Sequence, residues 1–84
     1  MTNTAAINAQ IREFVTANFY VADPAGLQDE DSLLDKGIID STGVMELVAF
    51  LEKTFNVKVA DAEMVPENLD SIGRASAFVH GKMG

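Results

Sequence analysis

The sequence predicts an all-α fold with three main helices and one short helix. Apolar residues recur at helical spacing over residues 4–19, over residues 41–54 and from Ser71 onward, so each of these stretches can bury one face of a helix. Pro66 suits the first position of a short helix just before the last stretch. The alternating residues 57–59 are too few to pair as a strand.

The helix boundaries follow from capping residues and apolar periodicity. Thr4 is a candidate N-cap for the first helix, which we expect to end near Phe19. The second helix should begin at Asp40 or Ser41 and run to about Thr54. The side chains expected to face the core are Ile7, Ile11, Phe14 and Val15 on the first helix, Val44, Leu47, Val48, Leu51 and Phe55 on the second, and Ile72, Ala75, Phe78 and Val79 on the last.

Residues 20–40, between the first two helices, have no clear period and predict a long loop. Pro24, Gly26 and Gly37 interrupt this segment, and loops of such length in compact domains are often functional. The aliphatic side chains expected to pin the loop onto the core are Leu27, Leu33, Leu34, Ile38 and Ile39.

An acidic composition without cysteine narrows the classes of function. The 84 residues give room for one domain, residues 1–84, which we expect to be monomeric. The absence of cysteine excludes disulfides, thiolate metal sites and cysteine nucleophiles. The formal net charge of −7 repels nucleic-acid phosphates and anionic lipid. This charge either favours protein partners with basic docking faces or serves solubility alone.

No stretch of the sequence has the pattern of a targeting, membrane or metal-binding segment. Residues 1–10 lack the basic and apolar regions of a signal peptide, and no apolar run approaches the length of about 18 residues expected of a membrane span. The expected location is therefore the cytoplasm. The acidic residues 29–31 do not follow the spacing of a calcium loop, so we interpret them as solvated loop charge and expect no metal site.

The candidate functional residue is Ser41, which stands at the start of the second helix after the long loop. One interpretation makes Asp40 and Ser41 ordinary N-caps, since serine and aspartate are each worth about 1 kcal/mol there over alanine. The other makes Ser41 a site of modification, because a phosphodiester on its hydroxyl would lie where free N–H groups and the helix dipole favour an anion. His80 is the only histidine and lies near the C-terminal end, so we expect no Ser-His-Asp triad.

The segments around and after Ser41 follow a wider pattern. They are Gly37–Ser41, the helix positions Val44, Glu46–Val48, Leu51–Glu52 and Phe55, and then Val57–Val59, Pro66–Leu69 and Asp70–Ile72. Together with the acidic charge, they resemble the acyl and peptidyl carrier protein family, of the stand-alone type. The resemblance covers roughly residues 14–79.

This resemblance implies a four-helix bundle with a long loop between helices 1 and 2. It also implies that Ser41, preceded by the family's aspartate at Asp40, receives 4′-phosphopantetheine from coenzyme A through a separate phosphopantetheinyl transferase. The arm would hold an acyl or aminoacyl group as a thioester, in fatty acid or nonribosomal peptide biosynthesis. The chain would then be a substrate and partner of enzymes rather than an enzyme. The thiol belongs to the cofactor, so the lack of cysteine is no obstacle.

Partners of the family contact the exposed side of the second helix. The residues outside the inward stripe or at its edge are Thr42, Met45, Glu46, Ala49 and Glu52. Met45 is either an adaptable partner contact or a filler at the edge of the core. Glu46 and Glu52 either pair with basic residues of a partner or are solvated charges. Phe50 either packs against the loop or is exposed for docking.

Two departures from the family pattern bear on the cargo. Thr42 and Gly43 follow Ser41 where fatty-acid carriers have a bulky aliphatic residue, and Lys53 interrupts the acids of the helix. Gly43 costs up to about 1 kcal/mol relative to alanine, so our hypothesis is that it leaves room for the arm or for a partner's backbone. Residues 66–72 resemble aminoacyl or D-alanyl carriers, which favours an adenylating ligase over an acyltransferase as the loading partner. The alternative from another class is an unmodified helical interaction module, with Asp40 and Ser41 as an ordinary cap.

Overall fold

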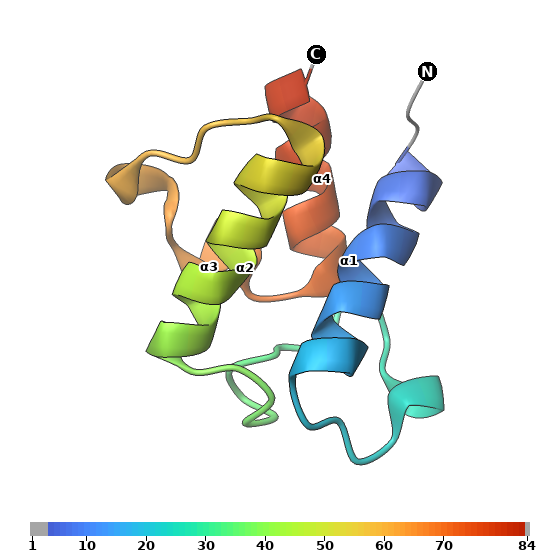
Figure 1. Ribbon diagram of the computed structural model, residues 1–84. Coiled ribbons are helices and arrows are strands. Elements are labelled where there is room, and N and C mark those ends of the chain that lie inside the picture. Colours follow the sequence, from blue (N-terminus) through green and yellow to red (C-terminus); the bar gives the residue numbers. More distant parts are fainter. Residues whose placement is uncertain (1–3, 84) are drawn as a thin grey trace.

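The computed structural model describes residues 4–83 of the chain (Figure 1). This part contains four helices and two 3-10 turns, joined by loops. The helices are α1 (Thr4–Asn18), α2 (Ser41–Phe55), the single turn α3 (Pro66–Leu69) and α4 (Ile72–Met83), and the 3-10 turns are η1 (Pro24–Gly26) and η2 (Asp61–Glu63). This part of the chain contains no strand. The predicted all-α fold, with three main helices, one short helix and a long first loop, is confirmed.

The helices are arranged so that the long loop lies beside the start of α2. Helix α1 packs along α4, and α3 leads directly into α4. In Figure 1 the start of α1 and the end of α4 lie at one end of the bundle, whereas the end of α1, the long loop and the start of α2 lie at the other. Ser41 therefore stands at the loop end of the molecule.

The core is built from one apolar face of each long helix. Its fully buried side chains include Ile7, Ile11, Val15, Leu47, Leu51, Ile72 and Val79. The predicted inward faces are confirmed, with Phe14, Val44 and Phe78 only partly buried at the edge of the core. Burying each aliphatic side chain contributes about 1.5–3 kcal/mol. Within residues 4–83, no helix combines the length and the apolar composition needed to cross a membrane.

The long loop is held on the core by four of its five predicted aliphatic anchors. Leu27, Leu33 and Ile39 are buried, and Ile38 packs against the core. The prediction for Leu34 is wrong, since its side chain is 40% exposed. Leu33 already fills the core position, and the turn of residues 32–37 directs the next side chain outward.

Polar contacts tie the first half of the loop to α1 and to the start of α4. The Arg12 guanidinium donates to the Leu27 carbonyl at 2.7 Å and pairs with the Asp29 carboxylate at 2.5 Å. The Asp29 carbonyl accepts from the Gly73 amide at 2.8 Å, and Asp31 pairs with Lys36 at 3.8 Å. Asp29 and Asp31 therefore have basic partners within the protein and are not simply solvated loop charges.

Helix ends and the aromatic contacts differ from expectation in detail. Thr4 lies inside α1 as its first helical residue rather than before it. Asn56 ends α2 in the left-handed conformation, with φ of 56°, which asparagine tolerates better than most residues.

Phe50 stacks on Phe14 of α1, with ring centroids 4.2 Å apart. Phe50 is partly buried in this contact with α1, which neither expectation, packing against the loop or exposure for docking, had included.

Candidate functional site

The start of α2 separates the roles of Asp40 and Ser41. Asp40 is the N-cap, and its Oδ1 accepts a hydrogen bond from the Gly43 amide at 2.8 Å. The Asp40 carbonyl accepts from the Val44 amide at 2.9 Å and so begins the helical hydrogen-bond ladder. Ser41 is the first helical residue and is exposed. Capping therefore explains Asp40 and leaves the Ser41 hydroxyl available to solvent.

Gly43 allows the loop to pack closely against the first turn of α2. It is buried, and a Cβ there would lie 2.5 Å from Ile39 Cγ1 and 3.0 Å from Phe19 Cε1. Both of these side chains belong to the protein's own core or its edge. The space at Gly43 is thus filled by the loop and the end of α1, which contradicts the hypothesis that it leaves room for an arm or a partner.

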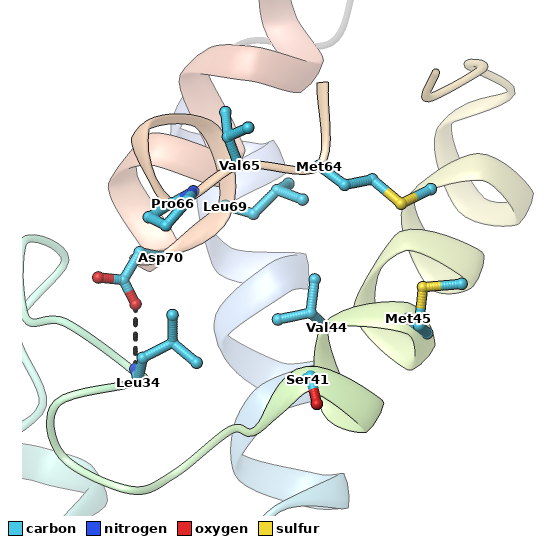
Figure 2. A pocket seen from close by; sticks show the side chains of 9 residues that line it. All are labelled: Leu34, Ser41, Val44, Met45, Met64, Val65, Pro66, Leu69 and Asp70. Carbon is cyan, nitrogen blue, oxygen red and sulfur yellow. Dashed lines mark hydrogen bonds between the residues drawn. The ribbon is translucent and has the colours of Figure 1, made fainter. Parts of the chain in front are cut away.

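A cavity of about 310 Å³ opens beside Ser41, between α2, α3 and the loop (Figure 2). Its lining residues are Leu34, Ser41, Val44, Met45, Met64, Val65, Pro66, Leu69 and Asp70. Apart from Ser41 and Asp70 these are apolar, so the cavity suits an uncharged group. This cavity was not predicted from the sequence, because its walls come from segments far apart in the chain and no periodic pattern relates them.

The predicted docking residues divide into two groups. Thr42, Met45, Glu46 and Ala49 are exposed on α2. Met45 is 57% exposed and lines the cavity, so it is not a filler at the edge of the core. Glu52 is half-buried, and its Oε2 accepts from the Val59 amide at 2.9 Å. Its carboxylate is thus partly used within the protein, unlike a solvated charge.

The side chains needed for a serine hydrolase or a metal site are not gathered near Ser41. His80 is in the last turn of α4, which lies at the opposite end of the bundle from the start of α2 (Figure 1). Among residues 4–83, no group of three or more histidine, cysteine, aspartate or glutamate side chains is arranged to hold a metal ion. The arrangement offers an exposed hydroxyl at a helix start and an adjoining apolar cavity.

Comparison with known proteins identifies a family that this chain matches. Residues 9–79 match the family model described as "Phosphopantetheine attachment site". Curated relatives include the D-alanyl carrier proteins of Streptococcus pyogenes serotype M5 (strain Manfredo) and serotype M1, each 38% identical over 53 residues. These alignments cover 63% of this chain and 66% of each relative, so the match spans just under two thirds of the relatives' length.

Proposed function

The chain belongs to the family of phosphopantetheine attachment domains, and on that premise we propose that it is a carrier protein whose prosthetic group is attached to Ser41. The group of this family is 4′-phosphopantetheine, held covalently. When bound, it supplies a terminal thiol on which an acyl or aminoacyl group is carried as a thioester. Members of the family carry cargo between enzymes and are not themselves catalysts.

The observation that carries the proposal is that Asp40 caps α2 while the Ser41 hydroxyl stays exposed. Asp40 caps α2 through the Gly43 amide, so the exposed Ser41 hydroxyl is not used in the cap and is free to be modified. The amides of Ser41 and Thr42 precede the first amide that the cap occupies, and unpaired amides at a helix start favour a phosphodiester. An unmodified interaction module accounts for the cap but not for the family match.

The surface around Ser41 fits a transferase with a basic, partly apolar docking face. Asp40, directly before the serine, and Glu46, further along α2, are exposed, and Met45 and Leu34 offer apolar contact. With a net charge of −7 over the chain, such a surface steers a cationic partner toward the site. Thr42, Met45, Glu46 and Ala49 are our candidate docking residues, with a smaller part for Glu52.

Two observations bear on the cargo and support different classes. The curated relatives are named D-alanyl carrier proteins, which supports an aminoacyl cargo loaded by an adenylating ligase. The cavity beside Ser41 is lined mainly by apolar side chains, which supports an uncharged acyl chain, because burying an ammonium group is costly unless a carboxylate pairs with it. The carboxylate in this lining, Asp70, already accepts hydrogen bonds from Ser32 and Leu34. An aminoacyl group would remain outside this cavity, in solvent or in the ligase.

Incubation with coenzyme A, magnesium and several promiscuous phosphopantetheinyl transferases tests the attachment. Intact mass should rise by one phosphopantetheine on the wild type and not on Ser41→Ala. Thr54→Ala, which removes an exposed hydroxyl near the other end of α2, is the matched control and should still be loaded. A wild type that no transferase modifies would instead support the interaction module. Charging the loaded protein with adenylating ligases against a panel of amino and fatty acids then identifies the cargo.

A further inference from the structure

Asp70, at the junction of α3 and α4, holds the second half of the long loop by three hydrogen bonds. Its carboxylate accepts from the Ser32 hydroxyl at 2.6 Å and from the Leu34 amide at 3.0 Å. Its carbonyl accepts from the Leu33 amide at 2.7 Å. Residues more than 30 positions apart are thereby joined, and two of the three bonds involve an ionised acceptor, which makes them stronger than neutral ones.

The hydrogen bonds continue from this junction toward Ser41. The Leu33 carbonyl accepts from the Ile38 amide at 3.0 Å and from the Ile39 amide at 3.3 Å. Ile39 is buried and directly precedes Asp40, the N-cap of α2. The chain that enters α2 is therefore connected, through Leu33, to the backbone carbonyl of Asp70. The Asp70 side chain adds the bonds to Ser32 and Leu34.

Leu34 depends on Asp70 more than its neighbours do. Its side chain is 40% exposed and is not part of the core, whereas Leu33 and Ile39 are buried. Figure 2 shows the bond between the Leu34 amide and Asp70, and shows the Leu34 side chain in the lining of the same cavity as Ser41. Apolar packing therefore holds Leu34 less firmly than it holds Leu33, and the polar contact with Asp70 matters more for Leu34.

We propose that Asp70 is a positioning residue for Ser41: it fixes the loop from Ser32 to Ile39, and Leu34 with it, in the arrangement that a transferase meets. This inference rests on the proposed attachment at Ser41. Without the two carboxylate bonds the segment from Ser32 to Leu34 is less ordered, although Leu33 stays anchored in the core. A transferase must then order this segment on binding. The cost falls on formation of the complex, so the transferase KM for the carrier rises while kcat changes less.

A second role for Asp70, as a favourable charge before α4, predicts a different result for one substitution. Asparagine at position 70 keeps an oxygen that can accept from the Leu34 amide and gains an N–H₂ group that can donate to the Ser32 hydroxyl. It lacks the negative charge that favours a helix N-terminus. A positioning role therefore predicts that Asp70→Asn resembles the wild type in the order of the loop and in its loading. A charge effect predicts that it resembles Asp70→Ala in both.

The first measurement is amide hydrogen exchange of the unmodified protein, which needs no transferase. Asp70→Ala should lower the protection of the Leu34 amide by about tenfold or more, the equivalent of one charge-assisted hydrogen bond. Asp70→Asn should restore most of it. Unchanged protection in Asp70→Ala would overturn the proposal. If that variant does not fold, Ser32→Ala, which removes the hydroxyl bonded to Asp70, serves in its place with the same two outcomes.

The second measurement is the kinetics of loading by a transferase that modifies the wild type. Asp70→Ala should raise the KM for the carrier several-fold with little change in kcat, and Asp70→Asn should not. Arg12→Ala is the matched control, because Arg12 ties Leu27 and Asp29 of the same loop but not Leu34. An equal KM change in Arg12→Ala, or none in Asp70→Ala, would overturn the positioning role. If no transferase loads the wild type, the proposed attachment at Ser41 is wrong. The hydrogen-exchange experiment then still decides whether Asp70 fixes the loop.

Discussion

The carboxylate of Asp40 accepts a hydrogen bond from the Gly43 amide at 2.8 Å and caps α2 without help from the Ser41 hydroxyl. Two neighbouring residues of similar capping preference are thereby assigned different tasks. Asp40 stabilises the helix, and Ser41 presents an exposed hydroxyl at its start. The stability of α2 and the proposed modification of Ser41 can therefore be measured independently.

Substitutions at Asp40 and Ser41 should affect stability very differently. Asp40→Ala removes the cap and should lower the free energy of unfolding by about 1 kcal/mol, whereas Asp40→Asn, another good cap, should cost little. Ser41→Ala should change it by less than about 0.5 kcal/mol, as for an exposed surface position. Urea denaturation followed by circular dichroism measures all three. A loss in Ser41→Ala as large as that in Asp40→Ala would mean that the serine also caps the helix.

Alanine at Gly43 and at Gly81 should have opposite effects. Both glycines lie in helices, where alanine is intrinsically better by up to about 1 kcal/mol. At Gly43 the new Cβ would lie 2.5 Å from Ile39 Cγ1, whereas at Gly81 nothing lies within 4 Å. Overpacking of this kind costs about 1–3 kcal/mol, so Gly43→Ala should lower the thermal midpoint and Gly81→Ala should raise it. A Gly43→Ala variant more stable than the wild type would show that Ile39 moves aside easily.

The stacked pair of Phe14 and Phe50 should couple α1 to α2. Phe50→Ala should cost about 2 kcal/mol of unfolding free energy, less than the 3–5 kcal/mol of a fully buried phenylalanine because Phe50 is only partly buried. Tyr20→Ala, at an aromatic position that is 85% exposed, is the control and should change stability by less than about 0.5 kcal/mol. The double-mutant cycle of Phe14 and Phe50 should give a coupling of about 0.5–1.5 kcal/mol. Additive effects would mean that the stacking adds nothing to burial.

The contact between Glu63 and Lys82 should make stability depend on pH. The pKa of the Glu63 carboxyl lies below its ordinary value of 4.5, first because Lys82 donates a hydrogen bond to it and second because the Ala60 amide does. Folding thus favours the ionised form, so this stabilisation is complete above about pH 4.5 and is lost as the pH falls through the lower value of the folded state.

The difference in unfolding free energy between the wild type and Glu63→Gln, measured by urea denaturation from neutral pH downward, should therefore shrink below pH 4.5. Lys82→Gln should remove most of the same pH-dependent component, because Lys82 supplies the first cause of the shift. A difference that stays constant down to the acid transition would contradict the coupling between η2 and α4.

Much of the fold could be predicted because the buried face of a helix appears in the sequence as apolar residues three or four positions apart. The inward residues of α2, such as Leu47 and Leu51, recur every three or four positions, and Pro66 marks the start of α3. The exceptions are places where a distant segment decides. Leu34 looked like an anchor of the loop but is turned outward by the neighbouring Leu33, and Phe50 finds its partner on α1.

The sequence by itself determined the helical class, the long first loop, the acidic charge and Ser41 as the residue to examine, because composition, period and capping preference are local properties. Only the tertiary structure decided what surrounds that serine. Asp40 alone takes the capping bond, Gly43 is filled by Ile39, and Asp70 reaches back 36 positions to hold the Leu34 amide. These contacts depend on how the loop closes over the bundle, and loop closure brings together residues whose spacing along the chain carries no periodic signal.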